Sequence, residues 1–145
     1  QDFLSLATME SIARDVAALS HHFRFVQLPC NLGMTEALTR VNQELDGARM
    51  PMVGAASQLG ITLMASATML QGQLSRGLPP FVTNALGMKS DAERAMQFVR
   101  STPGITTALV GMSNVNHVRE NLSIVSVAPA SKEQFGRLFQ RGEKA

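Results

Sequence analysis

Apolar residues recur along the chain in two spacings, which predict alternating helices and strands. One set lies a helical turn apart and predicts a helix over residues 6–19: Leu6, Met9, Ile12, Ala13 and Val16. Short runs rich in β-branched and other apolar residues predict strands over residues 23–28, 61–66 and 105–110. The middle run is apolar almost throughout, which is typical of a parallel strand buried on both faces.

Helix-start and helix-stop signals separate these runs. Pro51 suits a first helical position and Gly60 suits the position after the last turn. Ser90 with Glu93 forms a capping box, so a helix is expected from there to about residue 101. Asn114 is expected to cap the helix after the third strand.

Three further segments complete the predicted order. Residues 29–50 are expected to be irregular, with a short helix near 35–45, and residues 67–88 to form a long loop. Residues 129–145 are expected to hold a C-terminal helix, which Ser131 and Gln134 open as a second capping box. Its apolar face would carry Phe135, Leu138 and Phe139.

Alternation of strands and helices predicts an α/β fold with a parallel sheet, formed by residues 1–145 as a single segment. Three parallel strands leave two open edges, which invite pairing with another chain or with another copy. A closed (β/α)₈ barrel needs about 250 residues. The chain is therefore expected to be either a small open α/β domain or part of a barrel.

Composition narrows the class of protein. The chain has 145 residues, 45% of them apolar and 17% charged, with a formal net charge of +2, so it is expected to be globular without nucleic acid or membrane partners. The C-terminal basic residues Arg137, Arg141 and Lys144 are expected to lie on a solvated helix face. No apolar run approaches the roughly 18 residues that span a bilayer. The single cysteine, Cys30, fits a reducing, cytoplasmic compartment.

Two residue types argue against simple catalytic schemes. Cys30 follows a proline between apolar neighbours and is interpreted as a packing thiol. His21 and His22 lie at the amino end of a strand, where a capping or surface role is expected rather than catalysis. With three histidines and one cysteine, no metal-ligand spacing is present.

The chain begins with Gln1 instead of methionine, so it is expected to be a processed product or a fragment.

Gln27 is the first candidate binding residue. It shares a strand face with Phe23 and Phe25, near the carboxyl end of the strand, where parallel α/β proteins place their sites. A buried glutamine needs hydrogen-bond partners, which a ligand with an amide group or a backbone group would supply.

Two segments after strands are candidates for ligand contact. Ser66, Ala67, Thr68, Leu70 and Gln71 follow the second strand, where the alternative is a plain loop. Gly111, Met112 and Ser113 follow the third strand, and free N–H groups with a helix dipole favour an anion there. Ser113, His117 and Asn121 have i, i+4, i+8 spacing and are expected to share a helix face. An ordinary capped loop is the alternative to a phosphate site.

Three stretches together resemble aldo-keto reductases, over residues 6–140. "FRFVQLPCNL" resembles their sixth barrel strand, "GITLMASATMLQGQL" their seventh strand and cofactor loop, and "RSTPGITTALVGMSNVNHVRENL" their eighth strand and following helix. The last is the most specific, because Pro103, Gly104, Gly111, Ser113 and Asn121 all match in position. The resemblance implies a partial (β/α)₈ TIM barrel that holds the last three βα units.

The resemblance also implies binding of NADPH, or of NADH. Gln27 would hydrogen-bond the nicotinamide carboxamide, and residues 66–71 would follow the nicotinamide and the pyrophosphate. Gly111, Met112 and Ser113 would surround the adenosine phosphate, with His117 and Asn121 beside the ribose. Ser66 stands where many members carry an aromatic residue that stacks on nicotinamide, and His117 where Gln or Arg is frequent.

The family's catalytic residues are expected to be missing from this chain. In the family they are an Asp, a Tyr, a Lys and a His on the first four strands, and this chain has no tyrosine. The expected function is thus the C-terminal, cofactor-binding part of an NAD(P)H-dependent oxidoreductase that reduces small carbonyl substrates, inactive as an isolated chain. The alternative is a non-catalytic half-barrel that associates with itself or with a partner half.

Overall fold

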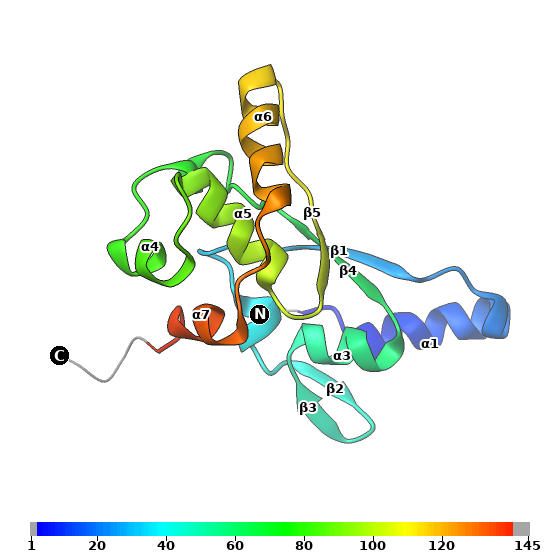
Figure 1. Cartoon of the computed structure of the whole chain (residues 1–145). Helices are drawn as coiled ribbons and strands as arrows, with labels where there is room; N and C mark the ends of the chain where they lie inside the picture. Colours follow the sequence, from blue (N-terminus) through cyan, green and yellow to red (C-terminus); the bar gives the residue numbers. More distant parts are fainter. Residues whose placement is uncertain (1–2, 141–145) are drawn as a thin grey trace.

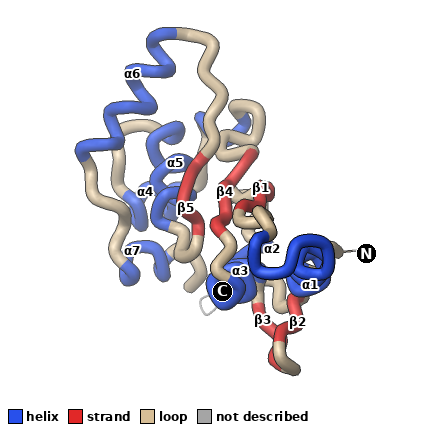
Figure 2. Tube along the Cα trace, turned by 90° about the vertical axis from the view of Figure 1, so that its right-hand side faces the viewer, coloured by secondary structure: helices blue, strands red, loops and turns tan. Residues whose placement is uncertain are grey.

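Three parallel strands form the central sheet of the computed structural model, which describes residues 3–140 (Figures 1 and 2). They are β1 (Phe25–Pro29), β4 (Thr62–Ser66) and β5 (Ile105–Ala108), in the order β1-β4-β5. Gln27 lies opposite Met64, and Pro29 opposite Ser66. The parallel α/β sheet predicted from the sequence is confirmed, and β1 and β5 are its two edges.

Helices precede and follow each strand, as the alternating pattern predicts. They are α1 (Leu6–Ala17), α2 (Glu36–Thr39), α3 (Met52–Leu59), α4 (Pro80–Leu86), α5 (Asp91–Ser101), α6 (Val115–Ser123) and α7 (Lys132–Arg137). Short 3₁₀ turns are η1 (Ala18–Ser20), η2 (Gln73–Ser75) and η3 (Ile124–Ser126). Within the described residues, no helix has the length and apolar character needed to cross a membrane.

The helix boundaries follow the local capping signals. The Ser90 and Ser131 hydroxyls accept hydrogen bonds from the Glu93 and Gln134 amides, which confirms both capping boxes. Gly60 ends α3 in the left-handed region at φ 65°, where a side chain would be strained. Pro51 is the N-cap of α3 instead of its first helical residue.

Two segments contain structure where loops were expected. Residues 29–50 hold the short helix α2 and also an antiparallel hairpin, β2 (Gln43–Leu45) with β3 (Ala48–Met50). Its turn residues Asp46 and Gly47 have φ of 51° and 77°, the combination that a two-residue hairpin turn requires. Residues 67–88 hold η2 and α4, which begins with Pro80 and has Gly87 as its C-cap.

A C-terminal helix was predicted over residues 129–145, and within the described part of this range α7 covers only Lys132–Arg137. Residues 141–145 lie outside the described residues. Phe135 and Leu138 are buried as predicted, whereas Phe139 is exposed. Arg137 pairs with Glu133 on the helix surface at 2.7 Å. Arg141 and Lys144 of the predicted basic face lie outside the described residues.

All the core helices pack against one face of the sheet. Leu63 and Ala65 alternate on β4, so they point to the same face, and both are fully buried. Leu63 packs with residues of α1 and α3, and Ala65 packs with residues of α4, α5 and α7. The tight approach of α3 to β5 is visible at Gly104, where a Cβ would lie 3.1 Å from Val53 Cβ.

The opposite face of the sheet has little cover. Phe25 on β1 is 61% exposed, and Gln27, two residues on, is exposed as well. The prediction of a buried Gln27 is therefore wrong, because none of the described elements covers that face. For the same reason β4 is fully buried on one face only, with Met64 half-buried on the other.

The apolar stripe of α1 is also largely uncovered. Leu6 is buried, but Ile12 is 57% and Val16 is 83% exposed. The helix prediction is confirmed, and of these apolar residues only Leu6, in the first turn, is fully buried.

Candidate functional site

A cavity of about 270 Å³ lies beyond the carboxyl ends of β4 and β5. The loop after β4, the turn after β5, the start of α5 and one face of α6 enclose it. The residues that line it are Met69, Gly72, Ser75, Ala92, Val110, Gly111, His117, Glu120 and Asn121. Three sequence-predicted site residues, Gly111, His117 and Asn121, are thus brought together.

Helix α6 supplies the polar wall of this cavity. Asn114 caps the helix, with its side-chain oxygen accepting from the Asn116 amide at 2.8 Å. Helical spacing then places His117, Glu120 and Asn121 on one face, at i, i+3 and i+4. Ser113 lies before the helix and is exposed, so the prediction that it shares this face is wrong, because the first helical residue is Val115.

Two glycines keep the cavity open. A Cβ at Gly72 or Gly111 would meet no heavy atom within 4 Å, so both positions border free space. Gly72 has a φ of 85°, which favours glycine there independently of the space. A ligand can therefore approach the backbone of both segments closely.

Hydrogen bonds fix the loop after β4 to its neighbours. Thr68 is buried, and its hydroxyl donates to the Leu109 carbonyl at 2.9 Å. The Asn31 side-chain amide donates to the Ala67 carbonyl at 2.9 Å. The loop is thus tied to both edges of the sheet at the level where the strands end.

The same loop has an unusual run of backbone conformations. Ala67, Leu70 and Gln71 have φ of 55°, 45° and 54°, in the left-handed region that residues with a side chain seldom adopt. Leu70 and Gln71 do not line the cavity, and Gln71 is exposed.

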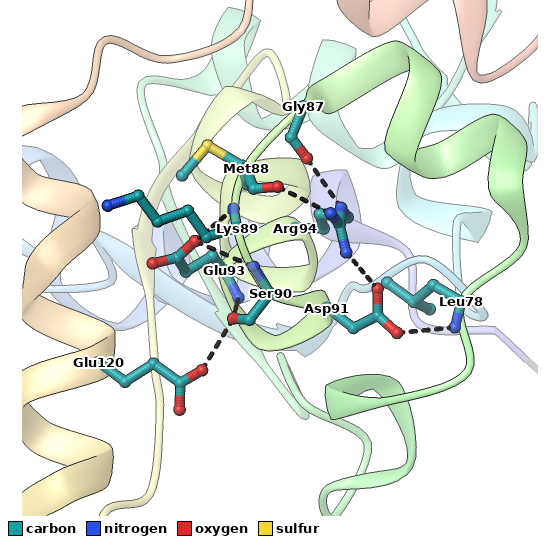
Figure 3. Close-up of polar contacts among 9 residues, drawn as sticks. All are labelled: Leu78, Gly87, Met88, Lys89, Ser90, Asp91, Glu93, Arg94 and Glu120. Carbon is teal, nitrogen blue, oxygen red and sulfur yellow. Dashed lines mark hydrogen bonds and ion pairs between the residues drawn. The ribbon is translucent and has the colours of Figure 1, made fainter.

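A network of polar contacts holds α6 against the start of α5 (Figure 3). The Ser90 hydroxyl donates to Glu120 Oε1 at 2.8 Å, and the Ser123 hydroxyl donates to Glu93 Oε1 at 2.8 Å. Glu93 Oε2 accepts from the amides of Lys89 at 2.7 Å and of Ser90 at 3.2 Å. The orientation of the polar face of α6 toward the cavity therefore depends on the capping box of α5.

Both acidic residues at the start of α5 are stabilised in their charged form. Burial alone would raise the pKa of Glu93, but the hydrogen bonds from Ser123, Lys89 and Ser90 outweigh it and lower that pKa below its usual value. The Leu78 amide, which donates to Asp91 at 3.0 Å, and the Arg94 guanidinium lower the pKa of Asp91, against an opposing effect of burial. Glu93 thus anchors the loop between α4 and α5, and Asp91 anchors the segment that precedes α4.

The remaining predicted site residues lie outside the cavity. Gln27 and Ser66 share the uncovered face of the sheet near the carboxyl ends of their strands. Met112 is exposed and borders a neighbouring apolar cavity of about 500 Å³ between α5 and α6.

Cys30 and His21 are both buried, in surroundings that fit a role in packing. Burial, with a smaller effect of the Glu36 charge, raises the pKa of Cys30 to about 11, although a hydrogen bond with Thr102 acts in the opposite direction. His21 is buried beside Glu10, at 3.7 Å, and beside the Arg24 guanidinium, at 2.9 Å. Within residues 3–140, no three His, Cys, Asp or Glu side chains form a group that could hold a metal ion.

Several cavity residues were not predicted as site residues. Glu120 adjoins Asn121 and follows His117 by three residues, so helical spacing was a usable signal for it. Ser75 and Ala92 come from elements distant in the sequence, and nothing local to them indicated that they meet α6.

Comparison with solved structures identifies the class of fold. Aldo-keto reductase AKR11C1 from Bacillus halodurans, in its holo form, superposes with a TM-score of 0.65 at 13% identity, over 99% of this chain and 49% of that one. A putative 2,5-diketo-D-gluconic acid reductase B gives a TM-score of 0.65 at 18% identity, over 93% of this chain and 42% of that one. The thermostable aldo-keto reductase Tm1743, in complex with the inhibitor epalrestat, gives 0.62 at 15% identity, over 93% and 44%.

The chain has the α/β fold of part of an aldo-keto reductase barrel, with three parallel strands and the surrounding helices. It spans about half the length of the structures it matches. No family model matches the sequence. A search of curated proteins finds no match.

Proposed function

We propose that the chain is the C-terminal, nucleotide-binding part of an aldo-keto reductase-like oxidoreductase that reduces carbonyls to alcohols with NADPH or NADH. The observation that supports this proposal is the cavity in which Gly111, His117 and Asn121 meet the loop after β4. It lies at the carboxyl ends of parallel strands, where proteins of this architecture bind ligands. The two open glycine positions and the polar face of α6 fit a nucleotide.

In this proposal, three segments of the chain contact different parts of the dinucleotide. Gly111, Met112 and Ser113 hold the adenosine phosphate ahead of the amino end of α6, and His117 with Asn121 lies beside the ribose. The loop over residues 66–71 follows the pyrophosphate, and Gln27 hydrogen-bonds the nicotinamide carboxamide from the uncovered face of the sheet, which Ser66 shares. When bound, the cofactor supplies the hydride.

Proton donation to the carbonyl must come from outside this chain. The sequence has no tyrosine. In this proposal the cavity holds the adenosine end of the cofactor, so none of its lining residues is assigned to protonate the carbonyl. The isolated 145-residue chain is therefore inactive in this proposal, and an aldehyde with NADPH is turned over only when the first strands of a barrel are supplied.

NMR titration of the isolated chain with millimolar NADPH or NADH tests the binding half of the proposal. We expect amide shift changes at Gly72, Gly111, His117 and Asn121, and none in α1. Asn121→Leu removes a polar group from the cavity at nearly constant volume and should abolish these changes. Asn116→Leu is the matched control, because Asn116 is exposed on the same helix and does not line the cavity. Shift changes that spare the cavity residues would refute the proposal.

A second candidate function is a half-barrel assembly module without catalysis of its own. Phe25 on the uncovered sheet face is exposed, and so are Ile12 and Val16 on α1, so the described residues leave apolar side chains uncovered in both places. β1 and β5 also present unpaired strand edges. Such a module would associate with a second copy or with a partner half.

A further inference from the structure

We propose that Asn31 is a positioning residue that holds the loop after β4 in the backbone conformation that forms one wall of the cavity. The proposal rests on the proposed function, in which this loop receives the dinucleotide. Asn31 follows β1, is fully buried and does not line the cavity. It therefore acts on a ligand only through the loop that it contacts.

The loop contains a turn that its own sequence does not favour. The Gly72 amide donates to the Met69 carbonyl at 2.9 Å, and the two residues between them, Leu70 and Gln71, have φ of 45° and 54°. A turn with positive φ at both central positions favours Gly, Asn or Asp there. Its mirror image makes the same hydrogen bond with negative φ, which Leu and Gln adopt without strain. Contacts from outside the turn must therefore select the left-handed form.

The loop after β1 supplies these contacts around one carbonyl group. The Asn31 side-chain amide donates to the Ala67 carbonyl at 2.9 Å, and the Leu70 amide donates to the same oxygen at 2.8 Å. Ala67 has a φ of 55°, so it is left-handed as well. The Leu70 side chain lies close by, since a Cβ built on Gly33 would be 3.5 Å from Asn31 Oδ1 and 3.9 Å from Leu70 Cδ2. Both ends of the segment that leads into the turn are thus held.

Asn31 is itself fixed in place by its neighbours. Its Oδ1 accepts from the Gly33 amide at 2.8 Å. Its backbone amide donates to the Met34 carbonyl at 3.1 Å, and its carbonyl accepts from the Met34 amide at 3.0 Å. Turning the side chain away from the loop would leave buried polar groups unpaired, so Asn31 is a rigid support.

The same set of hydrogen bonds reaches the cavity. Thr68, next to Ala67, is buried and donates to the Leu109 carbonyl at 2.9 Å, so the bonds span the carboxyl ends of all three strands of the central sheet. Met69 and Gly72, the first and last residues of the turn, both line the cavity. A change of the turn to its mirror image would redirect both of them. Backbone strain that is held by surrounding structure is concentrated at ligand-binding segments.

Asn31→Leu tests the proposal, because it keeps the side-chain volume nearly constant and removes both side-chain hydrogen bonds. NMR of the full chain without ligand measures the turn through intraresidue amide-to-α-proton distances, which are shorter at positive φ. We expect short distances at Leu70 and Gln71 in the unaltered chain and longer ones in Asn31→Leu. NADH and NADPH should both bind this variant roughly tenfold more weakly, the effect of about one lost buried hydrogen bond. Asn84→Leu, at an exposed position on α4, is the matched control and should change neither measurement.

A glycine in the turn separates positioning from a general loss of stability. Gln71→Gly favours the left-handed turn by itself, because glycine adopts positive φ without strain. In this background, Asn31→Leu should weaken binding only about twofold instead of tenfold and should leave the turn left-handed. A purely structural role of Asn31 would give the same loss in both backgrounds. Asn31→Asp is the second variant for the case that Asn31→Leu does not fold, since it keeps the acceptor for the Gly33 amide and removes only the donor to Ala67.

Two results would overturn the inference while leaving the proposed function standing. One is a left-handed turn that persists when the Asn31 donor is removed, and the other is an equal loss of affinity with and without Gln71→Gly. If neither NADH nor NADPH binds the unaltered chain, the proposed function is wrong. The NMR comparison without ligand then still decides whether Asn31 sets the turn.

Discussion

At the scale of the residue, the site depends on charges that are stabilised by backbone amides. Glu93 is buried and accepts from two amides and from Ser123, which lowers its pKa. A carboxylate with a lowered pKa in the folded state adds stability that is present above its unfolded-state pKa and is lost as the pH falls through the folded value. Glu93→Gln should thus reduce the free energy of unfolding by about 1–3 kcal/mol at pH 7, and by less at about pH 3.

Urea unfolding at the two pH values measures this difference. Glu133→Gln is the control, because the Glu133 side chain is 79% exposed and its pair with Arg137 should contribute little at either pH. An equal loss of stability for Glu93→Gln at both pH values would show that its charge is not the stabilising feature.

Cys30 provides a second test at the residue scale. The thiol is fully buried and its pKa is raised to about 11, so the reactive thiolate is scarce at neutral pH. We expect a colorimetric disulfide reagent to leave the native chain unmodified at pH 8 for as long as it stays folded. The same reagent should label Cys30 within minutes in guanidinium chloride. Rapid stoichiometric labelling without denaturant would contradict the packing interpretation.

At the scale of the element, two glycines both have room for a side chain but differ in backbone conformation. A Cβ at Gly47 or at Gly136 would meet nothing within 4 Å, but only Gly47, in the β2–β3 turn, has a positive φ, of 77°. Gly47→Ala should lower the free energy of unfolding by about 1–2 kcal/mol through strain. Gly136→Ala in α7 should raise it by up to about 1 kcal/mol through helix propensity. Thermal unfolding of the two variants should show shifts of opposite sign, and shifts of the same sign would contradict this assignment of the turn.

The elements that the sequence predicts well are those whose signals lie within a few residues. Ser90 with Glu93, Asn114 and Gly60 each act over one helical turn, and all three boundaries are confirmed. The hairpin was missed although Asp46-Gly47 is a strong local signal for it. The tie from Thr68 to Leu109 spans 41 residues, and that from Leu6 to Gln43 spans 37, so neither is encoded in a local pattern. The exposure of Gln27 was unpredictable for a related reason: it depends on which elements cover the sheet.

At the scale of the whole molecule, the helices cover one face of the sheet and the other face remains open. A barrel closes that face by bringing further strands around it. A second copy can do the same. A twofold axis along the strands would place β5 of one copy beside β1 of the other with all strands still parallel, and each edge would pair once. The interior of such an assembly would receive Phe25 from both copies.

Phe25→Lys tests this geometry, because it places a charge on the open face without touching the buried one. We expect the unaltered chain to self-associate in sedimentation equilibrium, and Phe25→Lys to raise the dissociation constant about tenfold or more, since a buried phenyl ring contributes roughly 1.5–3 kcal/mol. Gln58→Lys on the exposed side of α3 adds the same charge away from the open face and should leave association unchanged. A chain that remains monomeric and folded at all concentrations would show that the three-stranded sheet is stable without a partner. The assembly hypothesis would then be wrong.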